Sequence, residues 1–204
     1  MTNTNPDGST IPVSTLASLE VAIVGLLLAI VTGVPIGLLM GWYTGFRKFI
    51  KPVFEILRPI PPISWIPLTI LWLGIGIKAK AFIIFFAAFI PCVINSATGI
   101  EQTNKTLINV AKTCGASNVE IFFKVGIPSA LPIMFAGIRV ALGNAWATLV
   151  AAEMLAANSG LGYMILMGRN YARADIVILG MVLIGALGCL LYTSPSPRDV
   201  EESR

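Results

Sequence analysis

The stretch that decides the fold is Leu107–Pro132, LINVAKTCGASNVEIFFKVGIPSALP, which lies between two long apolar segments. Asn104 and Thr106 offer N-cap oxygens just before it, and Gly115 offers the left-handed residue that often closes a helix. Between these positions apolar residues recur at helical spacing, namely Leu107, Val110, Ala111 and Cys114. The sequence therefore predicts a short capped helix here.

A second short helix is expected directly after the first. Ser117-Asn118-Val119-Glu120 has the pattern of a capping box, and the helix that it opens carries Ile121, Phe122 and Phe123. We expect Gly126 and Pro128 to end it, and a long apolar segment to begin near Leu131. A short connection needs neither two capped helices nor apolar residues on them, so we expect a partner protein to cover this pair.

The composition indicates an all-α, polytopic membrane protein. Apolar residues make up 56% of the 204 residues and charged residues only 12%, about half the share usual in soluble domains. The net charge of +4 does not indicate nucleic-acid binding, because the basic residues lie at the ends of apolar segments. The chain has no histidine, and its three cysteines lack metal-ligand spacing, so we expect no metal site.

The apolar segments predict about five spans in a helical bundle. These are residues 16–42, a segment from the proline-rich stretch to about 76, residues 81–98, residues 131–155, and a last span from about 176 to 188. Residues 1–15 form a polar tail, and 16–188 form the membrane domain. We expect a short turn holding Lys78 and Lys80, and an outer connection over 156–175.

The distribution of basic residues orients the chain. The connections that we place in the cytoplasm hold Arg47, Lys48, Lys51, Arg58, Lys105, Lys112 and Lys124, and the outer ones hold Lys78, Lys80, Arg169 and Arg173. This excess places the helix pair 104–126 in the cytoplasm. Five spans then put the amino terminus outside, which indicates that a first span is missing from this sequence.

A proline-rich segment precedes the second span. Arg58–Pro67, RPIPPISWIP, holds four prolines within the nine residues 59–67 and cannot form a regular helix. Broken backbone in a membrane protein is tolerated where it is buried in protein or lines a wet cavity. We interpret it as a pore or gate element, and the alternative is a plain helix-entry loop.

The tail over 189–204 looks foreign to the fold. Cys189–Asp199 resembles one reading frame of a transposon-end adapter used in DNA library preparation, and the alternative is an ordinary polar tail. We expect residues 189–204 to be non-native.

The helix pair resembles the EAA loop of ABC-importer permeases. Asn109–Gly115, NVAKTCG, followed at the expected distance by Ile127 and Pro128, keeps the Gly and Pro register of that loop. Asn109 and Val110 replace its Glu and first Ala. Four further stretches are similar to permeases for nitrate, sulfonate, taurine and related small anions: LRPIPPISWIPL at 57–68, FAGIR at 135–139, VAAEML at 150–155 and SGLGYMI at 159–165.

The resemblance implies a type I ABC-importer permease fold and a set of partners. These are a second permease copy, two ATP-binding-cassette ATPase subunits that hold the ATP and Mg²⁺, and a periplasmic or lipoprotein solute-binding protein, all at a bacterial inner membrane. The chain itself has no G-x-x-x-x-G-K-[ST] phosphate loop and no nucleophile–base set, so we expect no enzyme activity and no bound cofactor. The rivals are an ion-coupled secondary carrier and a membrane scaffold that transports nothing.

Two groups of residues are candidates for function. Contact with the ATPase is expected at Leu107, Asn109, Val110, Ala111, Gly115, Ala116 and Pro128. The translocation path is expected at Pro61, Pro62, Ser64, Trp65, Asn95, Arg139, Asn144 and Glu153. Arg139 either helps an anion to pass, snorkels to the inner interface or braces a helix, and Glu153 either lines the path or ties the span to the outer connection.

Overall fold

The computed structural model describes residues 11–157 and 159–192, and every regular element in that part of the chain is helical. The elements are α1 (Ile11–Trp42), α2 (Thr44–Leu57), the 3₁₀ turn η1 (Pro62–Trp65), α3 (Ile66–Leu73), α4 (Ile77–Glu101), α5 (Lys105–Thr113), α6 (Asn118–Ile121), the π-turn η2 (Phe122–Gly126), α7 (Ile127–Ala156), α8 (Leu161–Asn170) and α9 (Ala174–Tyr192). The predicted all-α membrane fold is confirmed.

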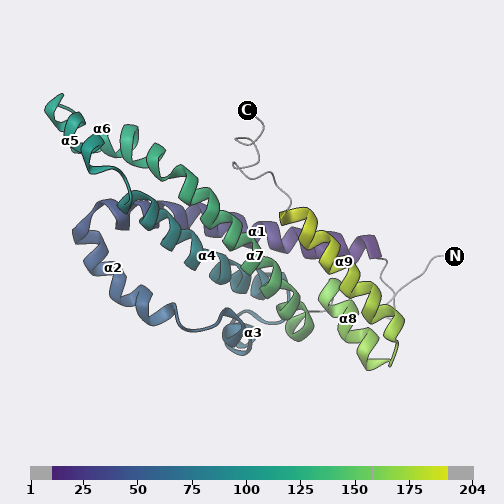
Figure 1. The fold of residues 1–204 in the computed structure, drawn as a ribbon. Coiled ribbons are helices and arrows are strands. Elements are labelled where there is room, and N and C mark those ends of the chain that lie inside the picture. The colour runs from purple at the N-terminus through teal and green to yellow at the C-terminus, as the bar shows by residue number, and fades with distance from the viewer. Residues whose placement is uncertain (1–10, 158, 193–204) are drawn as a thin grey trace, which may run out of the picture.

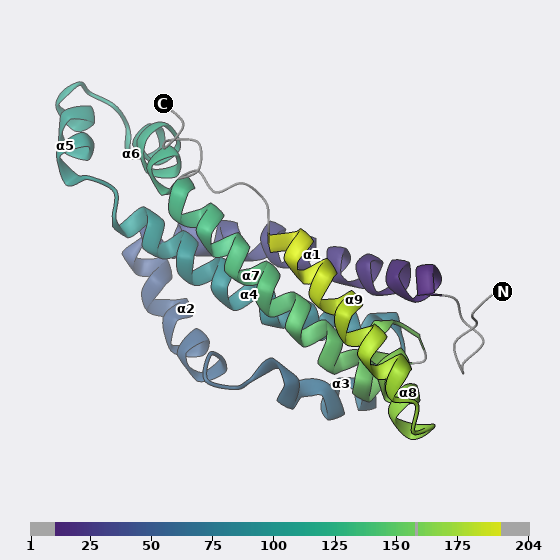
Figure 2. The same ribbon diagram turned by 45° about the vertical axis from the view of Figure 1, so that its right-hand side comes forward.

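Three long helices, α1, α4 and α7, lie side by side and form the bundle (Figures 1 and 2). Helices α1 and α4 run parallel, because Gly25 packs on Ile84 near one end and Gly41 on Ile100 near the other. Helix α7 runs antiparallel to α4, with Gly99 against Ala130. Helices α5 and α6, which we call the coupling pair after the role expected of them, project from one end of the bundle, and α8 lies at the other (Figure 1).

A stripe of small residues brings α1 and α4 close together. It occupies every fourth position of α1, at Gly25, Ala29, Gly33, Gly37 and Gly41. A Cβ added at Gly37 would lie 2.7 Å from the Cβ of Ser96 and nearer still to the carbonyl oxygen of Val93. Close backbone approach of this kind drives helix association in lipid, where the hydrophobic effect between helices is absent.

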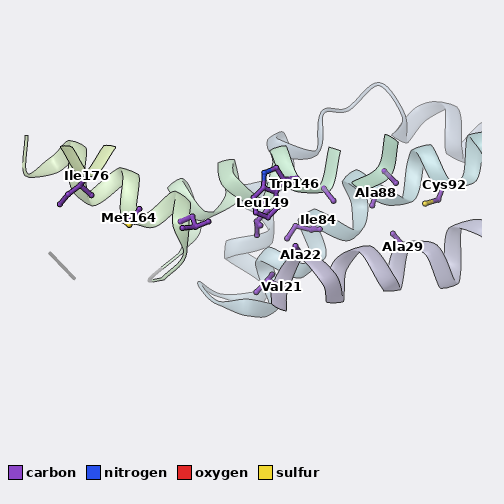
Figure 3. Close-up of a cluster of buried hydrophobic side chains, with 13 residues drawn as sticks. Val21, Ala22, Ala29, Ile84, Ala88, Cys92, Trp146, Leu149, Met164 and Ile176 are labelled. Carbon is purple, nitrogen blue, oxygen red and sulfur yellow. The ribbon is translucent and has the colours of Figure 1, made fainter. Parts of the chain in front are cut away.

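The buried apolar cluster runs along the facing sides of these helices (Figure 3). Val21 and Ala22 of α1, Ile84 of α4, and Trp146 and Leu149 of α7 contribute to it. The indole Nε1 of Trp146 also donates to the carbonyl of Ile184 at 3.3 Å, which fastens α9 to the bundle. Most of the remaining surface of α9 is exposed and apolar, as expected for a helix that faces lipid.

Because α1 and α4 are parallel, the chain must return between them, and α2 and α3 make this crossing. The two helices meet at 81° across the proline-rich break. Helix α2 lies beside Ala97 and Glu101, towards the coupling-pair end, whereas Ile66 of α3 packs with Ile83 and Ala152 near the α8 end. If this bent pair is one broken span, the count agrees with the expected five or so. The short connection expected before the second span is wrong, since residues 44–57 are a helix of their own.

Helix α7 has no break where one was expected. Gly126 and Pro128 do not end the second short helix, because α6, the π-turn and α7 form one helix from Asn118 to Leu155 and beyond. Proline lacks an N–H and its ring crowds the carbonyl four residues earlier, and a π-turn just before Pro128 widens the backbone at that point.

Three other boundaries differ from expectation. Helix α1 begins at Ile11, inside the expected polar tail, and Lys78 and Lys80 belong to the first turn of α4 because the turn is made by Gly74 and Gly76. Helix α9 continues to Tyr192, into the segment that we expected to be foreign, and residues 193–204 lie outside the described part.

Candidate coupling site and translocation path

The coupling pair is a rigid, capped hairpin. Asn104 Oδ1 accepts the Thr106 N–H at 2.8 Å and begins α5, and Gly115, with φ +82°, follows its end in the left-handed conformation. Ser117 and Glu120 form the reciprocal capping box of α6. The backbone and side-chain hydrogen bonds from Ser117, together with the charge of Lys124, lower the pKa of the Glu120 carboxyl. The predicted caps at Asn104, Gly115 and Ser117–Glu120 are confirmed, whereas Thr106 is no cap because it lies inside the first turn of α5.

One face of α5 is apolar and exposed. Leu107 is 51% exposed and Val110 54% exposed, and no α5 residue is buried. Asn109 is also exposed, and Ala111 is half-buried. Between α5 and the α6 end of the long helix lies a groove of about 400 Å³, lined by Ala111, Cys114, Gly115, Ala116, Glu120, Ile121, Lys124 and Val125. Pro128 lies one turn beyond this groove and is exposed.

The root of the coupling pair is braced against the inner end of α1. The rings of Phe122 and Trp42 lie 5.4 Å apart between centroids, and those of Phe122 and Tyr43 6.3 Å. Gly126 is buried against Trp42, where an added Cβ would come within 3.1 Å of the indole. A displacement of the coupling pair therefore pushes directly on α1 as well as on α7.

An ion pair that the sequence did not reveal joins three helices at the same end. Arg47 of α2 pairs with Glu101 of α4 at 2.8 Å and donates to the carbonyls of Met40 and Gly41 at the end of α1, each at 3.0 Å. Arg47 and Glu101 are far apart in the chain, and no local pattern pairs them.

Helix α2 turns its polar face towards the bundle. Arg47, Lys51, Glu55 and Arg58 line a groove of about 380 Å³ against α4, whereas Phe49, on the opposite face, is 77% exposed. A helix at a lipid boundary has this orientation when its polar side faces water inside the protein and its apolar side faces lipid. The groove is thus a candidate inner mouth of the path.

The proline-rich break lies midway along the bundle. Pro61 and Ser64 are exposed and Pro62 is half-buried, and the Trp65 ring packs on Phe86 at 5.2 Å. The indole Nε1 of Trp65 is buried without an acceptor among the described residues. The atom is enclosed by protein in this structure, and an unpaired buried donor of this kind is costly.

The other residues expected on the path lie at different levels. Asn95 donates to the carbonyl of Pro91, and its side chain packs on Gly137 of α7. Arg139 lies two residues after Gly137 and is half-buried. Asn144 is exposed. Within the described residues the structure does not gather these side chains into one cleft.

Glu153 is enclosed at the outer end rather than open to a cleft. It is 0% exposed and accepts from the Ser18 hydroxyl at 2.7 Å and the Gly162 N–H at 2.9 Å. This is the tie to the outer connection that the sequence left open as an alternative. Ser18 could not have been found from the sequence, because it lies in an apolar stretch far from Glu153 in the chain.

The family model for the binding-protein-dependent transport system inner membrane component matches residues 33–194. The chain belongs to this family. It is a multi-pass membrane protein and a permease subunit of the ABC-importer type, and the resemblance seen in the sequence is confirmed.

Relatives and solved structures agree with this assignment. A putative ABC transporter permease of Methanocaldococcus jannaschii is 42% identical over 179 residues, which are 87% of this chain and 67% of that protein. The taurine transport system permease of Escherichia coli is 35% identical, and a nitrate import permease of Synechocystis 34%, each over 86% of this chain and 64% of the relative. The chain thus spans about two thirds of the length of such relatives.

The fold is also that of a solved importer. An inward-facing structure of the MetNI methionine ABC transporter matches with a TM-score of 0.77 and 20% identity, over 95% of this chain and 96% of that chain. The likeness confirms the expected type I permease fold.

Proposed function

We propose that this permease carries a small anion across a bacterial inner membrane and is driven by a separate ATPase that binds the coupling pair. Taurine and nitrate, named for two relatives, are small and carry an acidic or anionic group, which supports this class of solute. The assembly has two permease copies, two ATPase subunits holding ATP and Mg²⁺, and a solute-binding protein at the outer face.

The observation that carries this proposal is the exposed apolar face of α5. Leu107 and Val110 are presented at the tip of the molecule on a helix that is capped at its start and closed by a left-handed glycine. Such a face is costly in water and is typical of a docking surface. The contact of Phe122 with Trp42 would transmit the movement of a docked subunit into the bundle.

Support for an anion path comes from the crossing made by α2 and α3. The groove beside α2 is lined by the cations Arg47, Lys51 and Arg58 and by the carboxylates Glu55 and Glu101. Arg47 pairs with Glu101 at 2.8 Å and Lys51 with Glu55 at 3.6 Å, which leaves Arg58 as the cation of this groove outside those two pairs. The Trp65 N–H lies further along the same crossing. Hydrogen-bond donors and cations of this kind suit an oxyanion.

The first experiment tests ATPase binding with Gly115→Asp. Asp tolerates the left-handed backbone better than most residues, so the hairpin keeps its shape while a carboxylate enters the docking face. Gly45→Asp is the matched control, because Gly45 is exposed on α2 with open space around it. We expect both variants to insert into membranes, and only Gly115→Asp to lose the co-purifying ATPase. Equal co-purification would remove the coupling role.

The second experiment tests the solute class. Complexes in vesicles are assayed for binding-protein-dependent ATP hydrolysis and uptake with taurine, other sulfonates and nitrate, with wild-type chain and Arg139→Gln. Uptake that needs ATP and persists without an ion gradient separates an importer from an ion-coupled carrier. Unchanged anion uptake by Arg139→Gln would exclude Arg139 from the path.

A further inference from the structure

Four helices meet in a buried polar cluster at the outer end of the bundle, which we call the outer clamp: Ser18, Lys80, Glu153 and the first turn of α8. Ser18 accepts the Leu161 N–H at 3.0 Å and donates to Glu153, which also accepts the Gly162 N–H. Lys80, only 3% exposed, reaches the carbonyl of Ser159 at 3.5 Å. The clamp joins α1, α4, α7 and α8.

The clamp is more than an ordinary helix cap. Helix α8 has Gly160 at its N-cap and no side chain of its own to satisfy its first N–H groups. Those groups are instead bound by Ser18 of α1 and Glu153 of α7. An added Cβ at Gly160 would collide with the Glu153 carboxylate. The start of α8 is therefore satisfied only while α1 and α7 keep one register.

The same helix that carries Glu153 begins in the coupling pair. It is continuous from Asn118, and α7 alone, with 30 residues, is about 45 Å long at 1.5 Å per residue. It is fixed to α1 at both ends, through Phe122 on Trp42 and through Glu153 on Ser18. One continuous helix therefore contacts α1 both at the coupling pair and at the outer clamp.

We infer that Glu153 is a positioning residue: by holding the first turn of α8 against α1 and α7, it sets how strongly docking of the solute-binding protein at the outer face changes ATP hydrolysis at the coupling pair. This inference rests on the proposed function. If the outer clamp favours one arrangement of α7, docking of the binding protein changes the affinity for the ATPase. By linkage, docking of the ATPase changes the affinity for the binding protein by the same factor.

The test uses the reconstituted complex of permease, ATPase and binding protein, with Glu153→Gln and the milder Ser18→Ala. Glu20→Gln is the control, because Glu20 is an exposed carboxylate on α1, the helix that carries Ser18. The readouts are basal hydrolysis, hydrolysis stimulated by the binding protein, and the Kd of the binding protein for the complex. We expect the two clamp variants to keep basal hydrolysis and to lose at least about fivefold in the stimulation ratio, the low end of usual coupling strengths.

A merely structural cluster would behave differently. If the clamp only stabilises the fold, its variants lower basal and stimulated rates in proportion, the ratio stays at the wild-type value, and the inference is overturned. If wild type is stimulated normally and both clamp variants match Glu20→Gln, the inference fails while the proposed function stands. If the wild-type chain binds no ATPase, both fail.

Discussion

Substituting Gly37 by alanine tests the close packing of α1 on α4 most directly. The new methyl group would lie 2.7 Å from the Cβ of Ser96 and closer to the Val93 carbonyl oxygen, and backbone cannot rotate away as a flexible side chain can. The two helices must separate along the small-residue stripe, which loosens the contacts on either side of Gly37.

The expected magnitude is set by two opposing effects. Overpacking of a tight contact costs about 1–3 kcal/mol, whereas replacing glycine by alanine inside a helix stabilises it by about 1 kcal/mol. Gly185→Ala in α9 isolates the second effect, because nothing lies within 4 Å of the position. The difference between the two variants is thus the packing cost of about 1–3 kcal/mol, roughly 5- to 150-fold in the unfolding equilibrium.

The assay is unfolding of the purified chain in mixed micelles by increasing sodium dodecyl sulfate, followed by tryptophan fluorescence and circular dichroism. Gly37→Ala should unfold at lower denaturant than Gly185→Ala. Equal stability of the two variants would refute the parallel α1–α4 contact described here.

Three further predictions use this preparation or, for uptake, the complexes in vesicles. Ser117→Ala removes the acceptor of the Glu120 N–H, so local stability should fall by about 1 kcal/mol and hydrogen exchange of that amide should quicken about fivefold, and unchanged exchange would contradict the capping box. Arg47→Gln should cost about 1–2 kcal/mol in the unfolding assay because it breaks the ties of its half-exposed guanidinium to α1 and α4, while the neighbouring Lys48→Gln should change stability by less than about 0.5 kcal/mol. Trp65→Phe keeps a six-membered ring to pack on Phe86 and removes an unpaired buried donor, and this gain opposes the cost of the smaller side chain, so stability should change little while anion uptake falls. Uptake at the wild-type level would exclude the indole from the path.

Local signals in the sequence predicted the coupling pair well. Asn104, Gly115 and the Ser117–Glu120 box act within a few residues of chain, so their patterns could be read directly. The expected helix end at Pro128 was wrong, because a π-turn can accommodate a proline within a long helix. The residue types at this position do not predict a π-turn.

The long-range arrangement could not be read in the same way. The sequence indicated that Arg58–Pro67 is broken, but not that α2 is a separate helix with its polar face inward, because amphipathicity does not say which face meets the bundle. Likewise, Glu153 stood out as a carboxylate in a span, while its partner Ser18 did not, since a hydroxyl among apolar residues fits any membrane helix.

The parallel packing of α1 and α4 also fixes an order of events at the ribosome. The nascent chain completes Trp42 and must synthesise the whole recrossing before Glu101 emerges, which at about 5–20 residues per second takes on the order of several seconds. During that interval the glycines of α1 lack their α4 partner, and the backbone of α1 is satisfied by its own helical hydrogen bonds. Substitutions such as Gly37→Ala should therefore leave early insertion untouched and cause their damage only after the translocon has released α4.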